Sequence, residues 1–253
     1  DVVFHLAAIS SVALSWKRPQ LTVDVNVKGT LSLLEAVKDA GISPRLVMVG
    51  SSEEYGAPRP DEMPVREETY LRPGNIYAIT KACQGMLGAV YAQAYGVDAI
   101  MVRAFNHIGP GQADFFAVSD FCHQVARIEK GLQEPAIHVG NLAAARDFTD
   151  VRDVVRAYRL LAERGRAGET YNVGSGHARS ISSMLDHIVS LSARPIDIVV
   201  DEDRFRPVDV PLVEADIAKL RAATGWSPEI DIDDSIAETL DWWRREEEGG
   251  DAL

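Results

Sequence analysis

The chain of 253 residues is 46% hydrophobic, so it can bury a substantial core as one large domain or as a main domain with a smaller lobe. Its formal net charge of -12 argues against broad affinity for nucleic acid or anionic lipid, because both require a basic surface. No apolar run reaches the roughly 18 residues that a membrane span requires, and the first residues lack the order of a signal peptide. We therefore expect a soluble, cytoplasmic protein that binds neither nucleic acid nor membrane.

Buried strands alternate with amphipathic helices in the first part of the chain. In order, these five elements are expected at residues 2–6, 21–40, 45–50, 75–95 and 98–103. The second helix should end at Gly96, since glycine is the usual residue just past a helix C-terminus. Such alternation predicts an α/β fold with a doubly wound, parallel, Rossmann-type sheet.

The pattern changes after Phe105. A loop rich in glycine and proline at 109–112 is followed by a predicted helix at 118–131 and by shorter elements. We expect a dinucleotide-binding domain built from residues 1–105 and 148–174. Residues 106–147 and 175–253 should form a smaller α/β lobe that binds the substrate.

A nucleotide-binding sheet of this kind normally opens with a strand, a glycine-rich turn and a helix that holds the pyrophosphate. The chain has no such opening, and residue 1 already lies in a predicted strand. Gly174 and Gly176 follow a strand but lack the third glycine and the acidic partner of a phosphate-binding turn, so we do not assign them that role. We interpret the missing opening as an N-terminal truncation that removed the first βαβ units.

Tyr77 and Lys81 are four residues apart near the start of a predicted helix, so both should project from one face. Ser51 follows a buried strand, at the sheet edge where ligands bind in doubly wound folds. Reduction of a ketone by hydride leaves charge on the oxygen, which requires a proton donor and a second hydrogen-bonding group. A nearby ammonium favours the phenolate and so lowers the pKa of a tyrosine, which is ordinarily about 10.

Several short stretches together carry a family resemblance. They are residues 5–8 (HLAA), 26–30 (NVKGT), 51–56 (SSEEYG), 77–81 (YAITK), 103–106 (RAFN) and 171–176 (YNVGSG). In this order they resemble the extended short-chain dehydrogenase/reductase family, the NAD-dependent epimerase/dehydratases that act on nucleotide sugars.

Further stretches narrow the resemblance. Residues 105–112, 119–121, 140–142, 146–148 and 206–211 look most like the GDP-4-keto-6-deoxy-D-mannose reductases of the family. The related GDP-mannose 4,6-dehydratases share several of these stretches but carry a longer, arginine-rich sequence where this chain has 109–112. The resemblance therefore implies reduction, by NADPH or NADH, of the C4 ketone of GDP-4-keto-6-deoxy-D-mannose to a GDP-6-deoxy-hexose.

The resemblance also implies roles for single residues. Tyr77 would be the proton donor, Ser51 the carbonyl anchor, and Lys81 both the partner that sets the pKa of Tyr77 and a ligand of the nicotinamide ribose. The cofactor, NADP or NAD, would further contact Ala7, Ala8 and Phe105. The GDP-sugar would contact Ser11, Glu53, Asn106, Arg146, Arg206 and Asp209. The resemblance implies no metal.

Some of these residues have simpler interpretations. Arg146 beside Asp147, and Arg206 near Asp209, could each be a local ion pair of little energetic consequence. Asn26 lies within a helical pattern where asparagine is unfavourable, so it could bend the helix near the site or face solvent.

Two other functions stay open from the sequence. The same serine, tyrosine and lysine serve nucleotide-sugar 4-epimerases and 4,6-dehydratases, which regenerate their cofactor. The missing glycine-rich opening leaves a non-catalytic binding or regulatory protein as a further alternative. By resemblance to its family, the chain is also expected to form a homodimer through helices 21–40 and 75–95.

Overall fold

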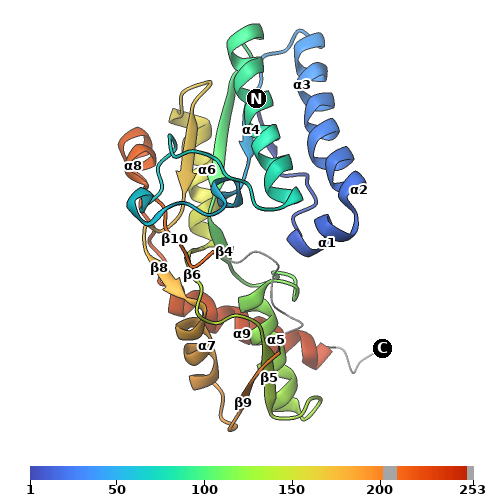
Figure 1. Ribbon diagram of the computed structural model, residues 1–253, viewed down its shortest axis with the longest axis vertical. Coiled ribbons are helices and arrows are strands. Elements are labelled where there is room, and N and C mark those ends of the chain that lie inside the picture. Colours follow the sequence, from blue (N-terminus) through green and yellow to red (C-terminus); the bar gives the residue numbers. More distant parts are fainter. Residues whose placement is uncertain (202–209, 250–253) are drawn as a thin grey trace.

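A computed structural model describes residues 1–201 and 210–249 and contains a four-stranded parallel sheet in the order β1-β2-β3-β7 (Figure 1). Its strands are β1 (Val2–His5), β2 (Arg45–Val49), β3 (Ala99–Ala104) and β7 (Thr170–Val173). Each neighbouring pair is parallel, so the carboxyl ends of all four strands lie at one edge. This is the α/β class with a parallel sheet that the sequence predicts.

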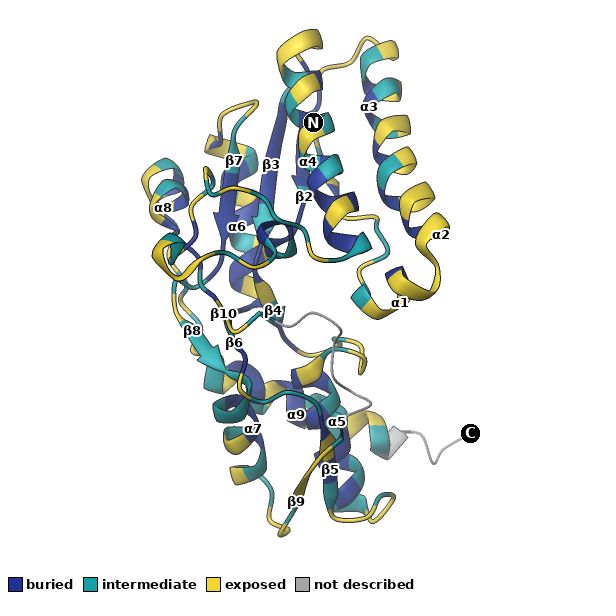
Figure 2. Ribbon diagram, viewed as in Figure 1, coloured by how far each residue is buried: buried dark blue, intermediate teal, exposed yellow. Residues whose placement is uncertain are grey.

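Helices cover both faces of this sheet. The alternation of side chains along a strand explains how: Leu46 and Met48 pack towards α3 (Gly29–Asp39) and α4 (Ile76–Tyr95), whereas Val47, between them, packs towards α6 (Val151–Arg164). All three of these strand residues are at most 1% exposed. Figure 2 colours most of β2 and β3 as buried. A strand buried on both faces needs a continuous apolar sequence, which residues 46–49 provide.

The segment before α3 is helical but irregular. The helix α1 (Val12–Lys17) precedes α2 (Pro19–Val23), and a π-helical turn, η1 (Asp24–Lys28), joins α2 to α3. The helix predicted at 21–40 is therefore real, and one wide turn interrupts it. The separate helix α1 was not predicted.

The ends of α4 follow ordinary capping chemistry. Asn75 is the N-cap, and its side-chain oxygen accepts the N–H of Ala78 at 2.8 Å. Gly96 ends the helix with φ 70°, a left-handed conformation that favours glycine. The expected ends of this helix are confirmed to within one residue.

A second part of the molecule lies below the sheet in Figure 1. Parallel strands β10 (Leu212–Val213), β6 (Ala145–Asp150) and β4 (Asn106–Ile108) adjoin in that order, and β8 (Ala178–Ser180) pairs with β6 in the antiparallel sense. The strands β5 (Ala136–Val139) and β9 (Asp197–Val200) form a separate parallel pair.

The apolar core of this second part is formed largely by helices. Phe121 of α5 (Ala117–Lys130) and Met184 of α7 (Ile181–Ser190) pack with Leu240 of α9 (Ile232–Gly249) in one cluster. The short helix α8 (Ala218–Thr224) instead packs beside α6 and β7. Among the described residues, no helix has both the length and the apolar character needed to cross a membrane.

Candidate active site

Ser51, Tyr77 and Lys81 converge at the carboxyl edge of the four-stranded sheet. Ser51 comes two residues after β2 ends, and Tyr77 and Lys81 lie in the first two turns of α4. The loop carrying Ala7 and Ala8 leaves β1 at the same edge of the sheet. The topology thus brings residues from three separate parts of the sequence to one place.

The side chains of Ser51, Tyr77 and Lys81 lie close together. The Ser51 hydroxyl lies close enough to the Tyr77 phenol to lower its pKa. The Lys81 ammonium lies 6.0 Å from the centre of the Tyr77 ring and donates to the carbonyl of Val49 at 2.7 Å and to Oε1 of Gln84 at 3.1 Å. All three residues are at least nine-tenths buried, so their polar groups interact in a medium of low dielectric.

Burial controls the proton affinity of these groups. It raises the pKa of Tyr77 to about 12, although the Ser51 hydroxyl opposes this increase. Burial also lowers the pKa of Lys81 to about 8, against the charge of Glu54. The expected decrease in the pKa of Tyr77 is therefore absent, because desolvation of the phenol outweighs the effect of the Ser51 hydroxyl, and the carboxylates of Glu53 and Glu54 raise the pKa further.

Asn26 links the site to the loop after β1. It is fully buried in the π-helical turn, where its amide accepts the N–H of Ile9 at 2.8 Å and donates to the carbonyl of Ile9 at 3.1 Å. The same amide donates to the Thr80 hydroxyl at 2.9 Å. Of the two interpretations left open by the sequence, Asn26 therefore distorts its helix beside the site and does not face solvent.

Glu53 lies near the three central residues, and Ser11 marks the start of α1. Oε2 of Glu53 accepts from the Asn75 side chain at 2.9 Å, so it adjoins the start of the helix that carries Tyr77. The Ser11 hydroxyl accepts the N–H of Leu14 as the N-cap of α1, a structural contact that the sequence analysis did not identify. Ser15, also missed, is fully buried and accepts the backbone N–H of Tyr77 at 3.3 Å.

Asn106 and Arg146 lie on the adjacent parallel strands β4 and β6. Asn106 is exposed, and Arg146 donates to the carbonyls of Ala145 and Val210 at 2.9 and 2.5 Å. Arg206 and Asp209 lie outside the described residues. Arg146 thus lies on the strand adjacent to that of Asn106, two residues before Phe148, which pairs with Asn106.

Asp147 turns away from Arg146, because successive residues of a strand project to opposite faces. Its carboxylate is fully buried and accepts the backbone N–H groups of Ser175, Gly176 and Ala215 at 2.7, 2.9 and 3.2 Å. A local ion pair with Arg146 is therefore not formed. The turn around Gly176 already holds an internal anion, in keeping with its exclusion as a phosphate-binding turn.

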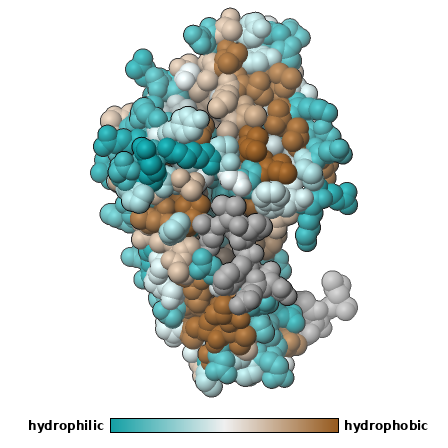
Figure 3. Space-filling model, in the orientation of Figure 1, coloured by the Kyte–Doolittle hydropathy of each residue, from teal (hydrophilic) through white to brown (hydrophobic). Residues whose placement is uncertain are grey.

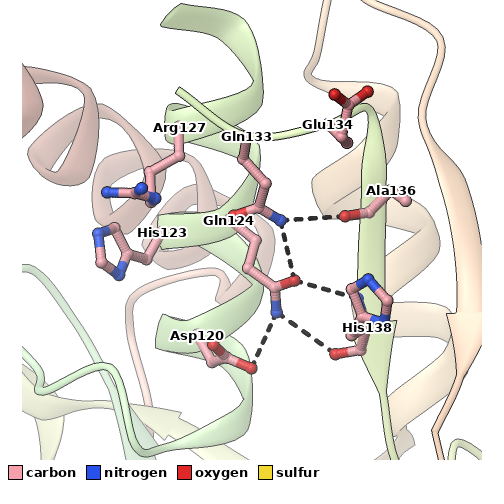
Figure 4. Close-up of a pocket in the computed structure, with 8 residues that line it drawn as sticks. All are labelled: Asp120, His123, Gln124, Arg127, Gln133, Glu134, Ala136 and His138. Carbon is pink, nitrogen blue, oxygen red and sulfur yellow. Dashed lines mark hydrogen bonds between the residues drawn. The ribbon is translucent and has the colours of Figure 1, made fainter. Parts of the chain in front are cut away.

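A separate cavity of 480 Å³ lies between α5 and β5 (Figure 4). The Gln124 amide accepts the N–H of His138 at 3.0 Å, and the Gln133 amide donates to the carbonyl of Ala136 at 3.0 Å. These side chains satisfy backbone groups along the open edge of β5. The cavity shares no lining residue with the site around Tyr77, and we assign it a packing role.

The residues present fit a nicotinamide nucleotide. The ammonium of Lys81 has three N–H bonds, of which two have acceptors within the described part of the chain, so the third can donate to a ribose hydroxyl. Ala7 and Ala8 are small residues at the same edge of the sheet, where a flat ring can approach the backbone.

A parallel sheet with helices on both faces and a serine, tyrosine and lysine at its carboxyl edge is the arrangement expected of a short-chain dehydrogenase/reductase. The family model described as GDP-mannose 4,6 dehydratase matches residues 1–239. The chain belongs to this family.

Known relatives and solved structures agree. The chain is 36% identical over 243 residues to a GDP-6-deoxy-D-mannose reductase of Pseudomonas aeruginosa, covering 96% of this chain and 80% of that protein. It is 31% identical to GDP-mannose 4,6 dehydratase 2 of Arabidopsis thaliana, and the match covers 95% of this chain and 65% of that protein.

Among solved structures, RMD from Pseudomonas aeruginosa complexed with NADPH superposes with a TM-score of 0.92 at 35% identity, covering 97% of this chain and 82% of that one. A UDP-glucuronic acid 4-epimerase from Bacillus cereus, in complex with UDP-glucuronic acid and NAD, superposes with a TM-score of 0.86 at 26% identity, covering 97% and 76%.

Proposed function

We propose that the protein reduces the C4 ketone of GDP-4-keto-6-deoxy-D-mannose to a GDP-6-deoxy-hexose such as GDP-rhamnose, with NADPH or NADH. The observation that carries this proposal is the convergence of Ser51, Tyr77 and Lys81, all at least nine-tenths buried, at the carboxyl edge of the sheet, where a protonated phenol can donate to a ketone oxygen. Similarity to a GDP-6-deoxy-D-mannose reductase and to a structure solved with NADPH supports the substrate and the cofactor.

In this mechanism, Ser51 and Tyr77 both donate hydrogen bonds to the ketone oxygen. A bound nicotinamide supplies the hydride that adds to C4. Tyr77 transfers its proton to the oxygen as the new C–H bond forms, which gives the alcohol. Lys81 stabilises the phenolate that remains, because an ammonium close to the ring favours the charged form.

We assign the sugar nucleotide to the lobe of residues 106–147 and 175–253, within which α8 packs beside α6 and β7 of the first part. Asn106 and Arg146 lie on neighbouring strands, where a guanidinium fork can bind the oxygens of a diphosphate. Ser11 and Glu53 would adjoin the sugar, while Arg206 and Asp209 would bind the guanosine end. Ala7, Ala8 and Phe105 would line the cofactor.

Consumption of reduced nicotinamide tests this function. With GDP-4-keto-6-deoxy-D-mannose we expect the protein to consume one NADPH or NADH for each sugar reduced, measured as loss of absorbance at the nicotinamide band. An epimerase or dehydratase regenerates its cofactor and would show no net consumption. A non-catalytic protein would show none either, and calorimetry with the nicotinamide alone separates these two alternatives.

We also propose that the protein works as a cytoplasmic homodimer through α3 and α4. Large apolar side chains are exposed on these helices, including Leu31, Met86 and Val90 at 39%, 58% and 55%. Apolar atoms gather over this region in the upper part of the space-filling view (Figure 3). Contiguous apolar surface of this kind is typical of subunit contacts.

A further inference from the structure

Glu54 is a buried carboxylate directly behind Ser51. Its side chain is 2% exposed, with Oε1 accepting the backbone N–H of Ser51 at 2.9 Å and Oε2 accepting Nε of Arg103 at 2.9 Å. Removing such a charge from water costs several kcal/mol, and a buried ion pair adds little net stability compared with apolar packing. The place of this pair beside Ser51 therefore points to a role in the site.

Two residues that follow Ser51 fix its conformation. Glu54 accepts the Ser51 N–H through its side chain and donates its own N–H to the Ser51 carbonyl at 3.2 Å. The Ser51 hydroxyl oxygen accepts the N–H of Glu53 at 3.2 Å. Because the oxygen is already an acceptor for the backbone, its own proton can be donated towards the substrate.

Arg103 connects Glu54 to the central strands. Arg103 projects from β3, and its Nη1 donates to the hydroxyl of Tyr55 at 3.0 Å and to the carbonyl of Glu67 at 2.8 Å. The Tyr55 hydroxyl donates to Oδ1 of Asn172 in β7 at 2.6 Å. The position of Glu54 is thus determined by two strands of the sheet and not by a surface loop.

Glycines allow the carboxylate to lie between β2 and α4. A Cβ added at Gly50 would lie 2.3 Å from Oε1 of Glu54, which a larger residue could not accommodate without displacing the carboxylate. At Gly85 of α4, an added Cβ would lie 3.9 Å from Oε2. Glu54 therefore faces the helix that carries Tyr77 and Lys81.

We propose that the Glu54–Arg103 ion pair is a positioning element for proton transfer, which fixes the Ser51 hydroxyl opposite the Tyr77 phenol and places a carboxylate against the helix of Tyr77 and Lys81. This inference rests on the proposed ketone reduction. Neither residue touches the reacting atoms, so both act through Ser51, Tyr77 and Lys81.

Burial raises the pKa of Glu54, while Arg103 and the Ser51 N–H lower it; in its charged form Glu54 favours the protonated state of both groups on α4. For Lys81, burial is the larger effect and lowers the pKa, while Glu54 raises it. For Tyr77, burial is again the larger effect and raises the pKa, and Glu54 raises it further. A protonated phenol and an ammonium are the states that donation to a ketone requires.

Other charged or titratable groups also face these residues. Besides burial, Glu53 raises the pKa of Tyr77. Burial raises the pKa of Tyr158, and Tyr77 raises it further. Burial lowers the pKa of His5, and the Lys81 ammonium lowers it further. Since Glu54→Gln changes none of these groups directly, comparison with the unaltered protein isolates the carboxylate.

The first experiment measures kcat and KM for reduction in the Glu54→Gln protein. We expect kcat to fall about 10- to 100-fold, while KM for NADPH stays within about two-fold of its value in the unaltered protein. The reason is that a displaced Ser51 misaligns the ketone for proton transfer but does not weaken binding of the cofactor. The basic limb of the pH profile should move to lower pH. The matched control, Glu129→Gln, removes one partner of a two-bond ion pair with Arg244 in the other part of the molecule and should change neither quantity.

A second variant removes the risk that Arg103 is left unpaired and unfolds the protein. Glu54→Leu combined with Arg103→Leu replaces the pair by apolar side chains, an exchange that is often neutral for stability. We expect this double variant to stay folded and to show the same loss of kcat. Wild-type kcat in the folded double variant would overturn the proposal.

Titration of Lys81 by NMR of ¹³C-labelled lysine does not depend on the substrate, so it separates this inference from the proposed function. The NMR signal of Lys81 is assigned as the one that disappears in Lys81→Met. The pH at which this signal is half titrated should be lower in Glu54→Gln than in the unaltered protein. An unchanged midpoint together with wild-type kinetics would refute the positioning role. If the unaltered protein fails to oxidise NADPH but the midpoint shifts, the proposed function fails while the electrostatic link between Glu54 and Lys81 stands.

Discussion

At the scale of single residues, burial decides the chemistry of the site. Tyr77 and Lys81 are one helical turn apart, and both lose most of their contact with water. The sequence predicts their proximity from the spacing alone. It does not predict the pKa of Tyr77, because desolvation depends on α1, the loop at 51–55 and α6, which the local pattern does not contain.

The phenol of Tyr77 gives the first prediction. Tyr77→Phe should lower kcat about 100- to 10,000-fold, the usual contribution of a general acid, with little change in nicotinamide binding by calorimetry. The control is Tyr171→Phe, which removes another buried phenol; Tyr171 lies in β7, and its hydroxyl accepts the N–H of Arg166. Equal loss of activity in both variants would mean that the effect is structural.

Lys81 gives a prediction for stability against pH. Its pKa is about 8 in the folded protein and returns to its ordinary 10.5 on unfolding. Between these values the unfolded chain binds a proton that the folded protein has released, so the free energy of unfolding should rise with pH, by about 3 kcal/mol. Denaturant titrations from pH 7 to 10.5 should show this rise in the unaltered protein and not in Lys81→Met; parallel curves would contradict the assignment.

At the scale of elements, periodicity and capping residues predict the strands and long helices closely. Asn75 and Gly96 mark the ends of α4, and the alternation of strands and helices gives the parallel sheet. The π-helical turn was not predicted, because it depends on hydrogen bonds between Asn26 and residues 17 and 54 positions away in the sequence. Helix α1 was also missed, since it is only six residues long.

The N-cap of α4 gives a prediction at this scale. Asn75→Ala should lower the free energy of unfolding by about 1 kcal/mol, because the N–H of Ala78 loses its acceptor. Asn75→Ser can keep the cap but cannot reach Glu53, so it should preserve stability while still changing kcat through the loss of that contact. Thermal unfolding and steady-state rates measured on both variants check this; equal stability loss in both would contradict it.

At the scale of the whole molecule, two parts with separate cores meet beside the carboxyl edge of the sheet. Sequence patterns place Asn106 and Arg146 in the second part, and the structure aligns their strands side by side. The role of Asp147 was not predicted, because its partners Ser175 and Ala215 lie 28 and 68 positions away in the sequence. Contacts over such separations become visible only after the strands are paired.

The exposed apolar surface of α3 and α4 gives a prediction for assembly. Leu31→Glu combined with Val90→Glu should convert a dimer to a monomer in analytical ultracentrifugation, because charges are costly to bury at a subunit contact. Leu132→Glu, an exposed apolar residue outside these helices, is the control and should leave the dimer intact. A monomer in the unaltered protein would exclude this assembly.

The most direct test of the central claim is the fate of the hydride when Tyr77 serves as proton donor. With NADPH dideuterated at nicotinamide C4, we expect one deuterium at C4 of the sugar for each cofactor oxidised, detected by mass spectrometry and NMR, and no product from Tyr77→Phe beyond a residual rate. Sugar product without deuterium, or full activity in Tyr77→Phe, would contradict it.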